Sequence, residues 1–208
     1  MPVLDFWYEF ASPYSRLAAA RVDEVAAGAG VAVRWRPFLL GPIFADQGWN
    51  TSPFNLYPAK GRYLWRDVGR IARGRGLPSV TPTPFPQNGL VAARLATIGV
   101  ADGWVAPFSK AVFEAEFGAG RDISDHRVLG GLLADLGLEP DSLISRARTD
   151  QVVKERLRAE TEEARSLGIF GAPSFVTEDG EMFWGDDRLA DALAWAAAGG
   201  DPAWRGGR

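Results

Sequence analysis

The stretch Val3-Leu-Asp-Phe-Trp-Tyr-Glu-Phe-Ala-Ser-Pro-Tyr-Ser-Arg-Leu-Ala-Ala-Ala20 joins a strand pattern to a helix pattern at a sharp corner. Residues 3–9 are mostly aromatic and aliphatic, which favours a strand. An alanine-rich helical pattern follows over residues 13–28 and ends in a glycine-rich stretch. The corner itself reads Ser12-Pro13-Tyr14-Ser15, so two serines stand three residues apart where the predicted helix begins.

The rest of the chain divides into a helical middle and a short β-rich end. Residues 31–38 read as a second strand, which completes a β-α-β unit, and residues 41–60 read as an irregular connection. Helices are predicted over 60–75, 88–102, 104–117, 125–137, 140–147 and 150–167, with the proline-dense loop 78–86 among them. A hairpin is predicted from strands 174–177 and 181–184 around the turn 178–180, followed by a helix over 188–198 that Gly185-Asp186-Asp187 caps.

Composition excludes several classes of protein. The 208 residues are 47% hydrophobic and 24% charged, and the net charge of −3 gives no basic footprint for nucleic acid. The chain contains no cysteine, so it has no dithiol of its own for a redox cycle. Its single histidine, His126, reads as the first residue of a helix, and no metal site is expected. No signal peptide or membrane-spanning run is recognised, so we expect a soluble, cytoplasmic protein.

The predicted order of elements resembles the thioredoxin layout with a helical domain inserted between its two halves. The fold class expected is therefore α/β, a thioredoxin-like fold with a large all-helical insertion domain. The boundaries expected are 1–41 plus 168–208 for the thioredoxin-like domain and 42–167 for the insertion. Thioredoxin-like redox proteins carry Cys-x-x-Cys at the corner where this chain has two serines. Because the chain has no thiol, we expect one to arrive with a ligand, and glutathione is the candidate.

More specifically, the chain resembles 2-hydroxychromene-2-carboxylate isomerases and kappa-class glutathione transferases, in the disulfide-oxidoreductase-A-like branch of the thioredoxin superfamily. The stretches that carry this resemblance are Phe10-Ala-Ser-Pro-Tyr-Ser15, Asn50-Thr-Ser-Pro53, Pro58-Ala-Lys-Gly-Arg-Tyr63, Phe85-Pro-Gln-Asn88, Gly168-Ile-Phe-Gly-Ala-Pro-Ser-Phe-Val176 and Phe183-Trp-Gly-Asp-Asp-Arg-Leu189. Each stretch is short, and it is their shared order that makes the resemblance specific.

Ser12 has two compatible interpretations. It lacks the general base that a nucleophilic serine needs, since the one histidine is more than a hundred residues away. Its hydroxyl can instead donate a hydrogen bond to a thiolate and keep the sulfur ionised, which makes Ser12 the catalytic candidate. The plainer interpretation is that Ser12 is only the N-cap of the helix, with Pro13 at the first helical position.

The resemblance implies further glutathione-binding residues. Pro173 is expected to follow a cis peptide bond and to face the corner, so that Ala172 offers its backbone N–H and C=O to the cysteinyl part of glutathione. Asp186 and Asp187 match the pair of residues that holds the γ-glutamyl group; the plainer interpretation, a helix start, accounts comfortably for one aspartate and less well for two. Asp186 replaces a residue that is often serine in the family, which leaves its own contact open.

Weaker candidates lie between residues 49 and 88. Asn50 matches a family asparagine near the thiol better than Asn55 does, and Asn88 is a third option. Lys60 is expected to hold a ligand carboxylate or else to be simply solvent-exposed. The aromatic residues of this region either line an apolar pocket or, as we expect for most of them, pack between the domains; they are Trp49, Phe54, Tyr57, Tyr63 and Trp65.

The function that the resemblance implies is a glutathione-dependent isomerase, which converts 2-hydroxychromene-2-carboxylate to trans-o-hydroxybenzylidenepyruvate by reversible thiolate addition. The partners expected are glutathione, a small aromatic carboxylate and a second copy of the chain in a homodimer. One alternative is a kappa-like glutathione transferase that acts on another electrophile. Another is a non-catalytic thioredoxin-like binding module, in which the Ser-Pro-Tyr-Ser corner is a relic.

Overall fold

The computed structural model describes residues 1–49 and 51–200, and within these residues four strands form one mixed sheet. The strands are β1 (Val3–Tyr8), β2 (Ala32–Pro37), β3 (Ser174–Thr177) and β4 (Met182–Trp184), in the order β2-β1-β3-β4. Strand β1 pairs in parallel with β2, with Val3 opposite Ala32, and antiparallel with β3, whose other neighbour β4 is also antiparallel. The predicted thioredoxin-like α/β class is confirmed.

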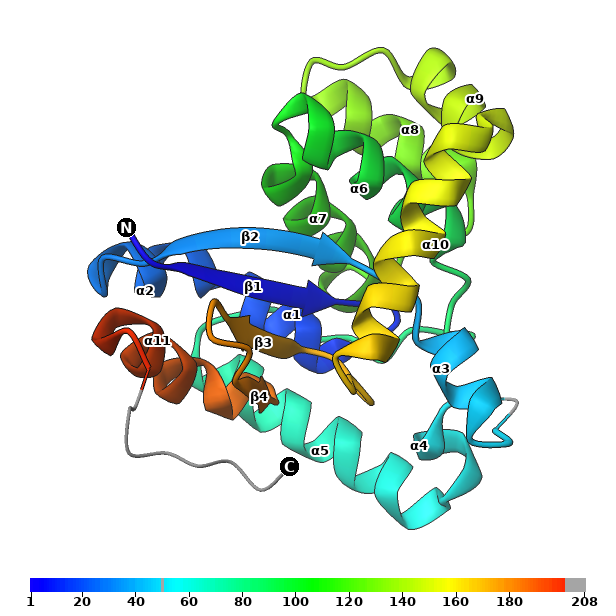
Figure 1. Cartoon of the computed structure of the whole chain (residues 1–208). Coiled ribbons are helices and arrows are strands. Elements are labelled where there is room, and N and C mark those ends of the chain that lie inside the picture. The colour runs from blue at the N-terminus through cyan, green and yellow to red at the C-terminus, as the bar shows by residue number, and fades with distance from the viewer. Residues whose placement is uncertain (50, 201–208) are drawn as a thin grey trace.

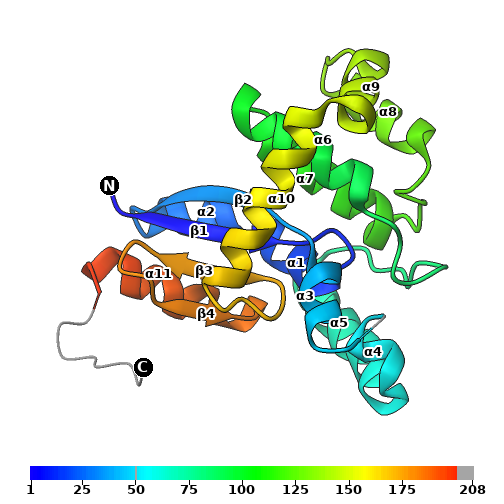
Figure 2. The ribbon, with the colours of Figure 1, turned by 45° about the vertical axis from the view of Figure 1, so that its right-hand side comes forward.

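Helices surround this sheet and also extend well away from it (Figure 1). Their bounds are α1 Pro13–Ala19, α2 Val22–Gly28, α3 Leu40–Asp46, α4 Pro53–Leu56, α5 Pro58–Gly74, α6 Leu90–Asp102, α7 Val105–Phe113, α8 His126–Asp135, α9 Pro140–Thr149, α10 Gln151–Ser166 and α11 Leu189–Ala198. Figures 1 and 2 both show α6 to α9 gathered on one side of the sheet and α3 to α5 on another, with α10 returning from the first group to the sheet.

Two predicted boundaries were wrong near the start of the chain. The helix predicted over residues 13–28 is two helices, because Arg21 leaves the helical region with φ −132° and its side chain turns toward Asp186. The connection predicted as irregular over residues 41–60 contains α3, α4 and the start of α5. Pro53 and Pro58 are the first residues of α4 and α5, where a proline is tolerated, so they start helices rather than break them.

Two further helical predictions also needed adjustment. The helix predicted over residues 104–117 is α-helical only to Phe113 and continues as a π-helical turn, η1 (Glu114–Gly118). The final helix begins at Leu189 after a 3₁₀ turn, η2 (Asp186–Arg188), and no side chain caps either element. The predicted aspartate cap is therefore wrong.

One face of the sheet carries the larger hydrophobic core. Leu4, Phe6 and Tyr8 alternate along β1 and point to this face, as the period of a strand requires. The same continuous cluster includes residues of α1, α2, α6, α7 and α11. The helical middle of the chain therefore packs directly on the sheet instead of standing apart from it.

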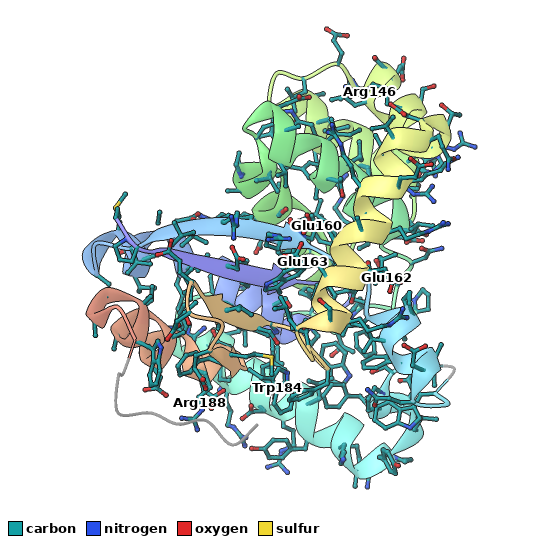
Figure 3. The ribbon with its side chains drawn as sticks, viewed as in Figure 1. Arg146, Glu160, Glu162, Glu163, Trp184 and Arg188 are labelled. Carbon is teal, nitrogen blue, oxygen red and sulfur yellow. The ribbon has the colours of Figure 1, made fainter. Side chains whose placement is uncertain are left out.

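The opposite face holds α10 through apolar and ionic contacts. Trp7 and Val176 pack there with Ala164 of α10, and the Arg36 guanidinium lies 4.2 Å from the Trp7 ring centroid. Arg36 also forms ion pairs with Asp5 and with Glu160 and Glu163 of α10, both of which face the sheet in Figure 3. This contact fixes the end of α10 just before the chain returns to β3.

In the described part of the chain, every helix is too short or too polar to cross a lipid bilayer.

Candidate active site

A cavity of about 1600 Å³ opens at one edge of the sheet. Strands β1, β2 and β4 run in the same direction and end at this edge, while β3 begins there. The segments that leave or enter the sheet at this point therefore line a common space, together with residues of α4, α5 and the loop before α6. Segments far apart in the sequence meet there, which is the usual setting of a ligand site in an open α/β sheet.

Ser12 lies in the wall of this cavity and is 8% exposed. Its Oγ accepts a hydrogen bond from the Ser15 backbone N–H at 3.1 Å, so it caps α1, and Pro13 is the first residue of that helix. The same hydroxyl donates its hydrogen to the carbonyl oxygen of Ala172 at 2.8 Å. The plainer interpretation, an N-cap, is thus confirmed, and the thiolate role stays a prediction.

The chain segment opposite Ser12 is Ala172-Pro173, immediately before β3. The peptide bond between these residues is cis, as predicted, and both residues line the cavity. The hydrogen bond from Ser12 holds Ala172 against the start of α1. The strand-to-helix corner and the start of β3 therefore face each other across one end of the cavity.

Asp186 and Asp187 both line the cavity, but their surroundings differ. Asp186 is 3% exposed and forms ion pairs with Arg21 at 3.1 Å and with Arg75 at 2.6 Å. The two arginines compensate the negative charge of this carboxylate. The ion pairs connect η2 to α5 and to the junction between α1 and α2. The Asp187 side chain is 77% exposed at the cavity, with Arg188 as its nearest cation at 3.7 Å.

The weaker candidates differ in whether they line the cavity. Lys60 is exposed at the cavity, with its Nζ 4.8 Å from the centroid of the Tyr57 ring. Asn88 lines the cavity, and its Oδ1 accepts the Leu90 N–H at the start of α6. Asn55 bonds to Thr51 and to the Phe85 carbonyl and lies outside the cavity wall. Asn50 falls outside the residues that the structure describes, so its role stays a prediction.

The aromatic residues of this region divide between the two roles. Trp49, Phe54 and Tyr63 line the cavity, and Phe54 also packs against the buried side chain of Leu64 and its neighbours. Trp65 packs edge-on against Phe85, with ring centroids 4.8 Å apart, and contacts the core. The difference follows from the helical period of α5, which turns Tyr63 and Trp65 to different sides of one helix.

Three features of the cavity were missed in the sequence. Phe170 and Trp184 form an exposed edge-to-face pair at its rim. The Tyr14 hydroxyl donates to Asp67, and burial and the Asp67 carboxylate raise the pKa of Tyr14, which therefore stays protonated. The third feature, Glu9, interrupts the apolar run directly after β1, and that interruption was the available signal.

These features define a thioredoxin-type scaffold whose strand-to-helix corner carries serine where thioredoxin-like redox proteins have cysteine. The sequence profile that describes the DSBA-like thioredoxin domain matches residues 3–194, and the chain belongs to this family. Within the family it resembles 2-hydroxychromene-2-carboxylate isomerases and kappa-class glutathione transferases.

The individual similarities extend over nearly the whole chain. The 2-hydroxychromene-2-carboxylate isomerase of Sphingobium xenophagum is 30% identical over 188 residues, which are 89% of this chain and 93% of that protein. Glutathione S-transferase kappa 1 of Rattus norvegicus is 25% identical over 200 residues, 90% of this chain and 87% of that protein. A solved structure of a 2-hydroxychromene-2-carboxylate isomerase superimposes with a TM-score of 0.82 at 26% identity, covering 92% of this chain and 93% of the other.

Proposed function

We propose that this chain is a glutathione-dependent isomerase that converts 2-hydroxychromene-2-carboxylate to trans-o-hydroxybenzylidenepyruvate. The observation that carries the proposal is the meeting of Ser12 Oγ with the Ala172 carbonyl, 2.8 Å apart in the wall of a cavity of about 1600 Å³. This pair offers one hydroxyl for a sulfur and one strand-like backbone for a peptide. The names of the similar proteins, isomerases and glutathione transferases, support the same conclusion.

The residues present fit glutathione. When bound, glutathione supplies a thiolate that adds reversibly to a conjugated double bond and permits rotation about it, with no net oxidation or reduction. Ser12 has a single hydrogen, which it now gives to Ala172, so it must exchange partners to reach a sulfur. A peptide N–H of the ligand takes its place at the Ala172 carbonyl, and the Ser12 hydroxyl becomes available to stabilise the thiolate.

The remaining contacts are assigned by charge. Asp187 has an exposed carboxylate that suits the γ-glutamyl ammonium, while the neutralised Asp186 holds the turn in place. Lys60 supplies an exposed ammonium for the carboxylate of a small aromatic substrate. The aromatic residues Trp49, Phe54 and Tyr63 provide apolar surface for its ring.

The test is a calorimetric titration with glutathione, followed by an absorbance assay of the isomerisation. We expect binding at millimolar glutathione or below, and turnover that S-methylglutathione, which has no ionisable thiol, does not support. Binding and conjugation of an aryl halide without isomerisation would instead identify a kappa-like transferase. A chain that does not bind millimolar glutathione would fit neither enzyme and would be a non-catalytic thioredoxin-like module.

A further inference from the structure

Glu9 occupies a position in the cavity wall next to Ser12. It directly follows β1, and its carbonyl oxygen accepts the Ser12 backbone N–H at 3.1 Å, so the two residues belong to one turn of chain. Both residues line the cavity. Gly89 leaves room beside the carboxylate, since a Cβ at that position would come within 3.7 Å of Glu9 Oε1 and 3.1 Å of Phe10 Cβ.

Two other acidic residues of the cavity already have ion-pair or hydrogen-bond partners. Asp186 is paired with two arginines, and Asp67 accepts hydrogen bonds from Tyr14 and Arg70. Asp187 is largely exposed to solvent. Glu9 differs because, in the part of the chain that the structure describes, no ion pair joins its carboxylate to a cation.

The group behind Glu9 is a second, deeper carboxyl. Glu116, in the turn η1, is 0% exposed, and neither of its side-chain oxygens has a hydrogen-bond partner among the described residues. Burial, together with the carboxylates of Glu9 and Asp122, raises the pKa of Glu116 to about 9, so it is neutral near pH 7. Burial likewise raises the pKa of Glu9 to about 7, although the Ala11 backbone N–H opposes this change.

A further polar group in the same wall remains without a partner. Gln87 is 5% exposed, and its Oε1 accepts the Ile123 N–H at 2.9 Å. Its Nε2 is buried with no hydrogen-bond partner in the described residues, although Gln87 lines the cavity. An orphaned donor of this kind in a cavity wall indicates that a polar ligand completes the site.

We propose that Glu9 is the proton acceptor for the thiol of the molecule bound in this cavity. The proposal rests on the proposed use of glutathione. In this step the thiol S–H bond breaks, an O–H bond forms on the Glu9 carboxylate, and the negative charge passes from oxygen to sulfur. Ser12 cannot accept this proton itself because its oxygen already accepts the Ser15 N–H and its basicity is that of a neutral hydroxyl.

Electrostatics favours this exchange within one cavity. A thiolate and a carboxylate that share a poorly solvated space repel each other, so they are more stable with a single proton between them. The charge of the cavity is then the same before and after the thiol ionises, because one anion replaces another. A nearby glutamate that is ionised just above neutral pH in the free protein can therefore receive the proton as the sulfur loses it.

The test counts protons by calorimetric titration of glutathione at pH 8 in two buffers that have different ionisation enthalpies. With a free thiol pKa of about 8.5, a thiolate that forms without a protein acceptor releases about three-quarters of a proton to the buffer. We expect almost no release from the wild type, because Glu9 keeps the proton, and release of about three-quarters of a proton from Glu9→Gln. Glu24→Gln, which removes an exposed carboxylate of α2, is the matched control and should behave as the wild type does.

A second measurement needs no variant and covers the case in which Glu9→Gln does not fold. In wild-type protein labelled with ¹³C at the glutamate carboxyls, glutathione binding at pH 8 should move one resonance to the chemical shift of a protonated carboxyl. The Glu116 carboxyl group is already protonated in the free protein, so the chemical shift of its resonance should not change. A spectrum without that movement, or equal proton counts for wild type and Glu9→Gln, overturns the role of Glu9 while binding itself leaves the proposed function intact. Absence of glutathione binding overturns both.

Discussion

At the scale of single residues, Ser12 connects helix capping to the proposed chemistry. One hydroxyl accepts the Ser15 N–H and donates to the Ala172 carbonyl, so its orientation is set from two sides. This orientation holds the oxygen at the cavity wall. Replacing Ser12 should therefore affect both the stability of the fold and the ionisation of a bound thiol.

We expect Ser12→Ala to raise the pKa of the glutathione thiol in the complex by roughly one to two units, because a hydrogen bond to a charged group contributes about 1.5–3 kcal/mol. Loss of the cap should also lower the free energy of unfolding by about 1 kcal/mol. An ultraviolet titration of the thiolate in the complex measures the first effect, and urea unfolding measures the second. Glutathione affinity near neutral pH should change less, since the backbone and glutamyl contacts remain.

The control is Ser15→Ala, one turn further along α1. Ser15 Oγ is buried and has no hydrogen-bond partner among the described residues, so its removal should leave the thiol titration unchanged. Coincident titration curves and equal turnover for wild type and Ser12→Ala would mean that Ser12 is only a helix cap.

At the scale of elements, Asp186 joins parts of the chain that are distant in sequence. It sits in η2 and binds Arg21 between α1 and α2 and Arg75 at the end of α5. Asp186→Asn should lower the free energy of unfolding by about 1.5–3 kcal/mol, because two arginines lose their charged partner. Asp187→Asn should change it by less than about 0.5 kcal/mol, since that side chain is exposed.

The same pair of variants separates stability from ligand binding. Glutathione affinity, measured by calorimetry at a temperature where both variants are folded, should fall more for Asp187→Asn than for Asp186→Asn. The opposite order would assign the γ-glutamyl contact to Asp186 and would contradict the assignment by charge.

Glu116, in the π-helical turn η1, makes the free energy of unfolding depend on pH. The pKa of Glu116 is raised from 4.5 to about 9, so between these values the folded protein holds a proton that the unfolded chain has released. Stability therefore falls as pH rises across this window. Glu116→Gln keeps the neutral form at every pH, and its advantage over the wild type should grow by about 1 kcal/mol per pH unit between pH 6 and 8.

Urea unfolding at several pH values checks this prediction. Glu155→Gln, which removes an exposed carboxylate of α10, is the control and should follow the wild-type pH dependence. If Glu116→Gln and the wild type keep a constant difference across the range, Glu116 is ionised in the folded protein and the assigned direction of its pKa is wrong.

At the scale of the whole molecule, the resemblance to kappa-class transferases and their isomerase relatives implies a homodimer. We expect light scattering at tens of micromolar to give about twice the mass of the 208-residue chain. The mass should stay at this value on dilution to low micromolar concentration if the interface is an obligate one. A monomer mass at tens of micromolar would reject the dimer.

Local sequence determined most of the elements and the family. The aromatic and aliphatic residues of β1, the serine before Pro13 and the hairpin around Gly180 each specify their conformation within a few residues. The resemblance then predicted a cis peptide bond before Pro173 that faces the Ser12 corner, and the structure confirms it and adds a hydrogen bond from Ser12 to Ala172. The irregular connection predicted over residues 41–60 was wrong because proline can end a helix or begin one, and Pro53 begins α4.

The surroundings of the site were decided by the tertiary structure alone. Asp186 and Asp187 are adjacent in sequence, yet one is buried between arginines and the other is exposed, since Arg21 and Arg75 reach only the first. Burial likewise raises the pKa of Glu9 and that of Glu116, and the Glu9 carboxylate, more than a hundred positions away in sequence, raises the pKa of Glu116 further. A sequence specifies which groups can ionise, whereas the fold sets their solvation and neighbours, and these determine which of them carry charge.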